Sequence, residues 1–263
     1  MENYKHKVLQ KYADGREPQR AELAGTYGLE FHYTKKLLTP YITPEKDVVE
    51  LGCGGGYYGL HFAKRCRSYL GIDLSPVNIA AFQKSIADAE LSNVSAQVGD
   101  ATRLTDISDD SFDVVLCLGP MYHLIREDRI RCIEECRRIC KPGGTIAMAF
   151  ISQVGAMAKF GNAWGWDKVL TPEVDHFVLD LGTDDASTDI FFYAMPEEIS
   201  SDAADAGLEV ITMAGLDFLL FEDAIERLTD TQRKVLFHAL DIMHESPACA
   251  GLANHAMLVC RKP

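Results

Sequence analysis

The 263-residue chain lacks any apolar run of the length that crosses a membrane, and positive charge is scarce in it. Lys and Arg together number 26 against 39 Asp and Glu, so the formal net charge is −13. A field of that sign repels phosphate backbones, which disfavours nucleic acid as a substrate or partner. The opening MENYKHKVLQKYADGREPQR also lacks the apolar core of a signal peptide, so we expect a cytoplasmic protein with no membrane contact.

The eight cysteines do not indicate disulfides, because the chain is large for a disulfide scaffold and shows no secretion signal. Cys132, Cys136 and Cys140 share one face of an expected helix, and ligands in a straight line cannot surround a metal ion tetrahedrally. We interpret them as small hydrophobic groups packed against a sheet, and we predict no metal site. His255, before the last expected strand, has no partner visible in the sequence.

Short apolar segments alternate with helical segments from residue 46 onward. Strands are expected over 47–51, 68–74, 94–101, 112–119 and 145–151, and helices over 58–66, 76–89 and 127–140. Strands that alternate with helices of this length predict parallel βαβ units and a doubly wound α/β fold. Two further strands, over 208–216 and 255–262, bring the expected sheet to seven mostly parallel strands.

We divide the chain into an N-terminal helical segment (1–44), a central core (45–151), an insert (152–195) and a C-terminal part of the core sheet (196–263). The insert is long, aromatic and irregular, and it is too rich in Trp, Phe and Val to be a disordered linker. We interpret it as a cap over a pocket. A dimer surface would have the same composition, so a homodimer is compatible with the sequence.

The segment VELGCGGGYYG, residues 49–59, concentrates glycine where a tight turn is needed or a ligand touches bare backbone. Gly54, Gly56 and Gly59 fit the dinucleotide pattern G-x-G-x-x-G, with Asp73 at about the expected distance, which permits a NAD-dependent oxidoreductase. In a second frame, Gly52, Gly54 and Gly56 follow an acidic residue. That frame resembles motif I of the class I S-adenosylmethionine-dependent methyltransferases.

Four further stretches resemble the same family in the same order: YLGIDLS, VGDATRL, FDVVLCLGPMYHL and RRICKPGG. The resemblance covers roughly residues 46–150, and the LGPMYHL variant is similar to a bacterial subgroup of small-molecule methyltransferases. It implies a Rossmann-like fold that transfers methyl from S-adenosyl-L-methionine to a small-molecule acceptor and releases S-adenosyl-L-homocysteine. The acidic charge and the lack of a nucleic-acid-binding appendage agree with a small acceptor.

The resemblance also implies which residues hold the cofactor. Glu50 would orient the ammonium, Asp73 would accept the ribose hydroxyls, and Asp100 would accept the adenine amino group. As an alternative, Asp73 and Asp100 could be turn residues that bond their local backbone. The full implied set is Glu50, Gly52, Cys53, Gly54, Gly56, Asp73, Leu74, Asp100, Ala101, Leu118 and Gly119.

Transfer is a direct displacement, so the protein must mainly hold the acceptor in line in a dry pocket. Tyr122 and His123 are the candidate catalytic residues, His123 as a base if the acceptor must lose a proton. The competing interpretation, which we favour for His123, is that Tyr122 packs under the cap and His123 bonds backbone. Oxygen, nitrogen, sulfur and carbon acceptors all remain open.

Four aromatic side chains are candidate pocket walls: His32, Tyr33, Trp164 and Trp166. They could stack an acceptor or surround a cationic one, although core packing explains the tryptophans equally well. Two other functions compete with methyl transfer. One is the NAD-dependent oxidoreductase, and the other is a non-catalytic binding protein with a methyltransferase fold.

Overall fold

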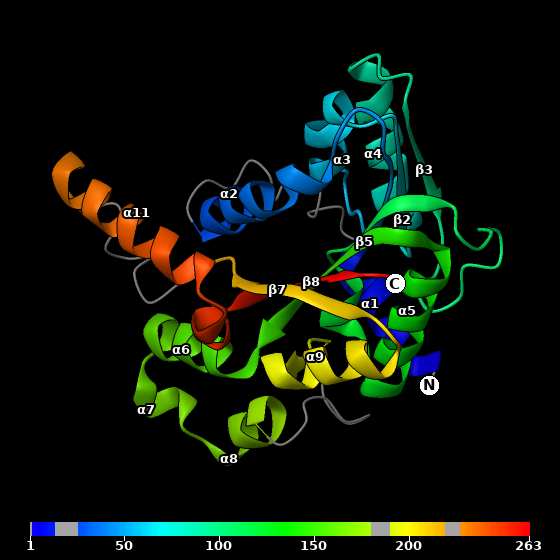
Figure 1. Cartoon of the computed structure of the whole chain (residues 1–263). Coiled ribbons are helices and arrows are strands. Elements are labelled where there is room, and N and C mark those ends of the chain that lie inside the picture. The colour runs from blue at the N-terminus through cyan, green and yellow to red at the C-terminus, as the bar shows by residue number, and fades with distance from the viewer. Residues whose placement is uncertain (1, 14–25, 180–189, 219–226) are drawn as a thin grey trace.

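The computed structural model describes residues 2–13, 26–179, 190–218 and 227–263. Its centre is an eight-stranded sheet in the order β3-β2-β1-β4-β5-β8-β7, with β6 paired to β5 (Figure 1). The strands are β1 (Asp47–Leu51), β2 (Ser68–Asp73), β3 (Val94–Val98), β4 (Phe112–Cys117), β5 (Cys140–Ser152), β6 (Tyr193–Ala194), β7 (Glu209–Gly215) and β8 (His255–Arg261).

Five neighbouring strands, in the order β3, β2, β1, β4 and β5 across the sheet, pair in parallel. Strand β8 runs antiparallel to both β5 and β7. The mostly parallel open sheet is therefore confirmed, with one strand more than the seven predicted. The additional strand, β6, has two residues that pair parallel to Ile151 and Ser152 at the end of β5. A pairing that short leaves no apolar alternation in the sequence, which is why the sequence did not indicate it.

Helices cover both faces of the sheet. They are α1 (Glu2–Tyr12), α2 (Thr26–Leu38), α3 (Tyr57–Phe62), α4 (Pro76–Asp88), α5 (Arg126–Ile139), α6 (Gln153–Trp164), α7 (Trp166–Val169), α8 (Pro172–Val174), α9 (Pro196–Asp205) and α11 (Asp230–Glu245). Within the described part of the chain, no helix is both long enough and apolar enough to span a bilayer.

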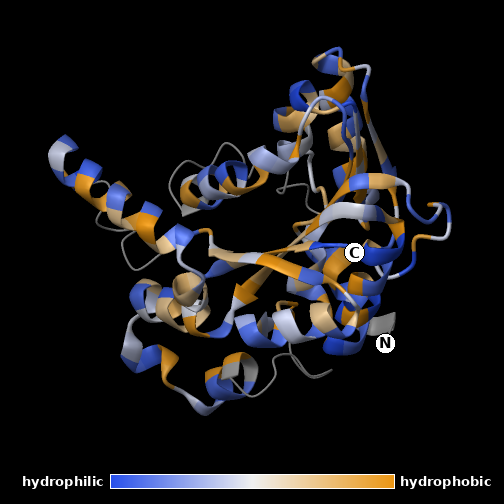
Figure 2. Ribbon diagram, in the orientation of Figure 1, coloured by the Kyte–Doolittle hydropathy of each residue, from blue (hydrophilic) through white to orange (hydrophobic). Residues whose placement is uncertain are grey.

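Alternate side chains of each strand enter two separate apolar clusters, as strands buried on both faces require. Val48 of β1 joins the cluster that contains Phe82 of α4, together with side chains from α2, α3, α6 and α11. Its neighbour Val49 joins the opposite cluster, with Ile133 of α5 and Ile199 of α9. Figure 2 shows the apolar strands enclosed by helices whose outward faces are hydrophilic.

Two helices begin at residues whose side chains cap the first turn. The hydroxyl of Ser75 accepts the backbone N–H of Asn78 at 3.4 Å, and Pro76 occupies the first turn of α4. Thr229 starts α11 with a capping box that it shares with Gln232. These caps fix where each helix meets the sheet.

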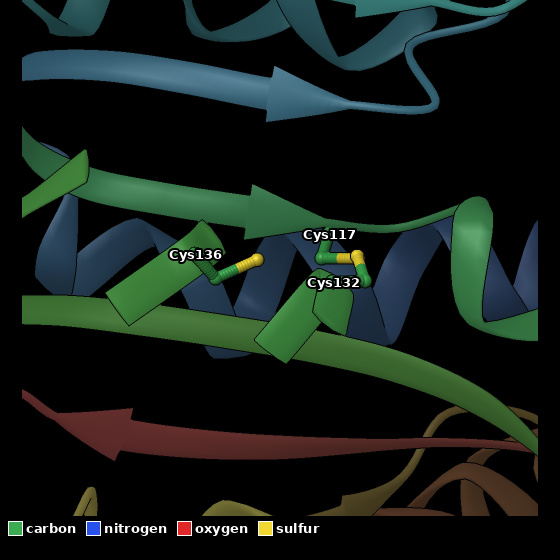
Figure 3. Close-up of side chains that lie close together, drawn as sticks. All are labelled: Cys117, Cys132 and Cys136. Carbon is green, nitrogen blue, oxygen red and sulfur yellow. The ribbon is translucent and has the colours of Figure 1, made fainter. Parts of the chain in front are cut away.

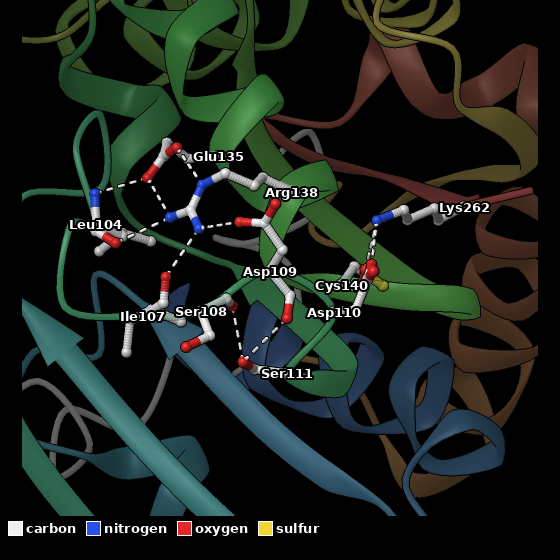
Figure 4. A network of polar contacts seen from close by, with 10 residues as sticks. All are labelled: Leu104, Ile107, Ser108, Asp109, Asp110, Ser111, Glu135, Arg138, Cys140 and Lys262. Atoms are coloured by element: carbon white, nitrogen blue, oxygen red, sulfur yellow. Dashed lines mark hydrogen bonds and ion pairs between the residues drawn. The ribbon is translucent and has the colours of Figure 1, made fainter.

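Arg138, near the end of α5, braces the connection between β3 and β4 (Figure 4). Its guanidinium donates to the backbone carbonyls of Leu104 and Ile107, each at 2.8 Å, and to the carboxylates of Glu135 and Asp109. The bond from Arg138 holds the pKa of Glu135 below its usual value. The chain that follows β3 is therefore tied to α5.

Gly56, just before α3, supports a stability prediction. Its φ is +86°, and a Cβ there would lie 1.9 Å from Cδ2 of Phe82. We expect Gly56→Ala to lower the free energy of unfolding by about 2 kcal/mol or more, from overpacking and from left-handed strain. Denaturant unfolding of the ligand-free protein measures this.

Gly28→Ala is the matched control, because Gly28 lies in α2 with nothing within 4 Å of the added Cβ. Since alanine is the better helix former, we expect this substitution to stabilise the protein by up to about 1 kcal/mol. Equal unfolding curves for Gly56→Ala and the parent protein would contradict the packing of Gly56 on Phe82.

Candidate active site

A cavity of about 250 Å³ opens at the carboxyl ends of β1, β2, β3 and β4, the edge where open α/β sheets bind ligands. All the predicted cofactor-binding and catalytic residues line it except Gly56. Those residues are Glu50, Gly52, Cys53, Gly54, Asp73, Leu74, Asp100, Ala101, Leu118, Gly119, Tyr122 and His123. Gly56 is instead packed against Phe82, one turn behind the cavity wall.

The loop after β1 has left-handed backbone at Gly52 and Gly54, with φ of +73° and +51°. A Cβ on Gly52 would lie 2.5 Å from Cδ of Pro120 and 2.9 Å from Cα of Gly119, in the loop after β4. Glycine is therefore required both by the conformation and by the close approach of the two loops. The result is a stretch of bare backbone that faces the cavity.

Asp73, the last residue of β2, holds that loop in place. Its Oδ2 accepts the N–H of Gly54 at 2.9 Å, and its Oδ1 accepts the N–H of Ser75 at 2.8 Å. Burial raises the pKa of Asp73, and the backbone donors partly oppose the shift. The carboxylate thus bonds local backbone, as the turn interpretation expected, and also lines the cavity.

Asn78, in the first turn of α4, adds an unsatisfied group beside Asp73. Its Nδ2 donates to Oδ1 of Asp73 at 3.2 Å, while its own Oδ1 is buried without a hydrogen-bond partner. Buried polar atoms usually have partners, so this oxygen suits a ligand donor. A carboxylate and a neighbouring amide oxygen match a vicinal diol such as a ribose. The residues therefore fit an adenosyl group.

Glu50, in β1, is a buried carboxyl group with 1% of its surface exposed. Burial raises the pKa of Glu50 to about 8; the negative charge of Asp73 adds to the shift, and the hydroxyl of Tyr69, which donates at 2.7 Å, opposes it. At neutral pH the group therefore carries its proton. It would ionise when a cation such as an ammonium arrives beside it.

Asp100, after β3, is held by the N-terminal helix. Lys5 of α1 donates to its Oδ2 at 2.7 Å, and Thr102 donates to its Oδ1 from both backbone and hydroxyl. Burial acts to raise the pKa of Asp100, but the bonds from Lys5 and Thr102 keep it below the usual value. This acid stays ionised at the edge of the cavity.

The N-terminal helix α1 forms a wall of the site that was not expected from the sequence. Tyr4, Val8 and Tyr12 line the cavity at a spacing of four residues, so one face of the helix covers it. The hydroxyl of Tyr4 bonds Asp128 of α5, and that of Tyr12 lies 2.9 Å from Nε2 of His123. This i, i+4, i+8 pattern in an otherwise polar opening is the signal that could have indicated the wall.

His123 uses both ring nitrogens within the protein. Its Nδ1 lies 2.8 Å from the carbonyl oxygen of Ile190, which can only accept, so Nδ1 carries a proton. In the neutral ring, Nε2 then accepts from the hydroxyl of Tyr12. The backbone bond matches the interpretation that the sequence favoured. Catalysis by His123 remains a prediction.

A second aromatic wall stands where α2 meets α3. The ring of Phe31 stacks on that of Tyr57 at 4.0 Å, and Tyr58 meets both rings edge-on. All three line the cavity, together with Glu30. His32 and Tyr33, the predicted wall residues, follow Phe31 on the same helix and point elsewhere, because successive helical residues turn by about 100°.

The four candidate walls lie away from the cavity. Tyr33 is fully buried and donates to Asp241 of α11 at 3.2 Å, and His32 is exposed. Trp164 and Trp166 are 58% and 48% exposed. None of the described residues of the 152–195 insert lines the cavity, and 180–189 lie outside the described residues. Its role as a cap remains a prediction.

Three thiols gather between β4 and α5: Cys117, Cys132 and Cys136 (Figure 3). Their sulfurs lie within 4.8 Å of one another and all three are buried; the closest pair, Cys117 and Cys132, is 3.6 Å apart. Cys117, at the end of β4, lies beside the two cysteines of α5, a proximity that the sequence did not indicate. A structural zinc site takes four ligands, and this group offers three.

The comparisons with known proteins agree with this geometry. A family model described as a methyltransferase domain matches residues 48–144, the part of the chain that carries the glycine loop and the two β-strand acids. The ubiquinone biosynthesis O-methyltransferase of Acinetobacter baylyi is 28% identical over 178 residues, which cover 66% of this chain and 67% of that protein. The match favours the frame of Gly52, Gly54 and Gly56, which resembles methyltransferase motif I, over the dinucleotide pattern G-x-G-x-x-G.

Two solved structures share the fold. An S-adenosylmethionine-dependent methyltransferase from Methanosarcina mazei superposes with a TM-score of 0.59 at 17% identity, over 86% of this chain and 96% of that one. Phosphoethanolamine N-methyltransferase 2 from Haemonchus contortus, in complex with S-adenosyl-L-methionine, gives 0.60 at 16% identity, over 90% and 53%. The matched domain and the curated relatives support a methyltransferase enzyme, and the solved structures share its Rossmann-like core.

Proposed function

We propose that this chain transfers a methyl group from S-adenosyl-L-methionine to a small-molecule acceptor by direct in-line displacement in the cavity above β1 and β4. The observation that carries the proposal is the convergence of Glu50, Asp73 and the bare loop at Gly52 on one cavity. Bound S-adenosylmethionine supplies a methyl group on a sulfonium, which is already a strong electrophile. The chain therefore has to bind, orient and exclude water.

Each polar residue has a proposed task in binding. Asp73 and the amide oxygen of Asn78 accept the ribose hydroxyls, and Asp100 with Ala101 faces the adenine. Glu50 accepts the ammonium of the methionine moiety, whose chain lies along the loop at Gly52. Asp73 and Asp100 act as hydrogen-bond acceptors in these tasks, and Glu50 ionises when the ammonium binds beside it.

The N-terminal helix closes the site. Lys5 ties α1 to the loop after β3, and Tyr12 ties it to His123 after β4, so the helix bridges two loops of the cavity wall. A closed wall keeps water from the sulfonium. We therefore assign His123 to the support of α1, and Tyr122, which lines the cavity, to the acceptor wall.

Small acceptors suit this enclosed and acidic site better than polymers. The formal net charge of −13 opposes nucleic acid. Eight similar curated proteins carry the name ubiquinone biosynthesis O-methyltransferase, at 25–29% identity, so an oxygen acceptor is compatible with the proposal.

Asp73→Asn tests the cofactor assignment. Because the carboxylate would lose a charge-assisted bond to the ribose, we expect the dissociation constant for S-adenosylhomocysteine to rise by about tenfold to a hundredfold. Isothermal titration calorimetry measures it. Asp88→Asn, at the exposed end of α4, is the matched control and should bind as the parent protein does. NADH binding without S-adenosylhomocysteine binding would refute the assignment.

The raised pKa of Glu50 predicts that binding of S-adenosylhomocysteine releases a proton. Its pKa of about 8 leaves it protonated at pH 7, and an ammonium beside it would ionise it, so close to one proton should leave per ligand bound. Calorimetry at pH 7 in buffers of different ionisation enthalpy counts the protons. The release should vanish in Glu50→Gln; a release that persists in that variant would mean another group titrates.

Glu50 also affects the ligand-free protein. A carboxyl whose pKa is raised on folding stabilises the fold below its unfolded pKa and loses that contribution as pH rises through about 8. Glu50→Gln should therefore gain stability relative to the parent protein between pH 5 and 8, as pH rises.

Lys5→Ala tests the closure by α1. The Lys5–Asp100 pair is partly exposed, so we expect a modest loss of about two- to fivefold in affinity for S-adenosylhomocysteine. Lys11→Ala, exposed on the same helix, should have no effect. Tighter binding in Lys5→Ala would show instead that Lys5 competes with the ligand for Asp100.

A further inference from the structure

The cavity extends well beyond the acids assigned to the cofactor. Glu30 of α2 lines it and lies beside His255, the first residue of β8. In the sheet order β8 stands four strands from β2, which ends at Asp73. At the usual spacing between strands that separation is about 19 Å. Glu30 therefore marks the end of the cavity that is remote from the ribose site.

Glu30 belongs to a buried group of three titratable side chains. The exposed fractions of Glu30, His255 and Asp217 are 5%, 6% and 0%. Nδ1 of His255 lies 2.7 Å from Oδ2 of Asp217 and 3.7 Å from Oε2 of Glu30. Buried groups of this kind are held by their partners, because an unpaired charge in the interior is costly.

Asp217 orients the imidazole of His255 through two hydrogen bonds. Its Oδ1 accepts the backbone N–H of His255 at 2.6 Å, while its Oδ2 accepts from the ring Nδ1. The side-chain amide of Asn254 lies 3.0 Å from the same ring nitrogen. The imidazole is thus oriented from the far side, and its protonated nitrogen is within ion-pair range of the carboxylate that lines the cavity.

The walls around Glu30 are aromatic. Phe31 follows it on α2 and, with Tyr57 and Tyr58, forms the stacked and edge-on group that lines the cavity. Tyr122 also lines it, with its ring centroid 5.5 Å from that of His255. Planar rings pack well against such walls. A carboxylate offers about four acceptor positions, so one engaged by the protein can still accept from a ligand.

We propose that this end of the cavity takes an aromatic acceptor that bears a hydroxyl group, with Glu30 as the catalytic residue that accepts the hydroxyl hydrogen bond and then its proton. His255 and Asp217 are positioning residues that hold Glu30 and share the proton. The inference rests on the proposed function, because it assumes that the remainder of the cavity holds the cofactor.

The chemistry balances without any further reactant. The acceptor O–H proton passes to the Glu30 carboxylate, the freed oxygen pair forms the bond to the methyl carbon, and the carbon–sulfur bond breaks to leave a neutral thioether. A phenolic hydroxyl is acidic enough for a carboxylate to take its proton in the transition state, whereas an alkyl hydroxyl is a far weaker acid.

The experiment compares phenol with its methyl ether, anisole, which has the same ring but no proton to donate. Ligand-observed NMR titration measures both with the full chain saturated by S-adenosylhomocysteine. A hydrogen bond to a carboxylate should make phenol bind about tenfold or more tightly than anisole. In Glu30→Leu the two probes should bind alike, while the affinity for S-adenosylhomocysteine is unchanged.

The variants separate a binding role from a folding defect. Glu30→Gln keeps the shape and one oxygen acceptor, so it should retain part of the preference for phenol, and Glu134→Leu, exposed on α5, should retain all of it. Equal binding of phenol and anisole by the parent protein would overturn the proposal. A preference that survives in Glu30→Leu would do the same.

Failure of the proposed function has a different signature. If S-adenosylhomocysteine does not bind, the ratio of phenol to anisole affinity is still measured on the ligand-free chain, where Glu30 should give the same preference. If S-adenosylhomocysteine binds but phenol and anisole bind equally, only the proposed acceptor site is rejected.

Discussion

The site depends on the crossing of two loops at Gly52 and Gly119. A Cβ on Gly119 would lie 2.9 Å from the carbonyl oxygen of Gly52, and one on Gly52 would meet Gly119 and Pro120. The bonds of the sheet continue into both loops, because Gly52 donates to Ile72 at 2.7 Å and Leu118 donates to Leu51 at 3.2 Å. The floor of the cavity is therefore as rigid as the strands that carry it.

Three carboxyl groups on this edge have different surroundings, so their pKa values shift in different ways. Glu50 is enclosed and keeps its proton, Asp73 is buried but receives backbone donors, and Asp100 is ionised beside Lys5. Their order across the sheet places Glu50, the group that keeps its proton, in the strand next to β4. Burial raises the pKa of Glu50 and Asp73, because desolvation acts on the charged form, whereas the bonds from Lys5 and Thr102 outweigh burial at Asp100.

Elements far apart in the chain complete the enclosure. Tyr12 meets His123, and Glu30 meets His255, across more than a hundred residues in each case. Both contacts come from helices that precede the core, so the segment before β1 supplies residues to two parts of the cavity wall. Of the described helices of the 152–195 insert, α6 packs against β5 and β6 instead, and α7 packs on α6 (Figure 1).

The sequence by itself determined the alternating strands, the parallel core and the line of motif residues along one edge, because apolar period and glycine positions are local properties. Carboxyl ends of parallel strands always meet at one edge, so Glu50, Asp73 and Asp100 could be grouped without coordinates. Only the tertiary structure placed α1 over the cavity, paired His255 with Asp217 and brought Cys117 to Cys132 and Cys136. Those contacts depend on how helices and strand ends pack in space. Residues that meet only through such packing have no regular separation in the sequence, so no local pattern indicates them.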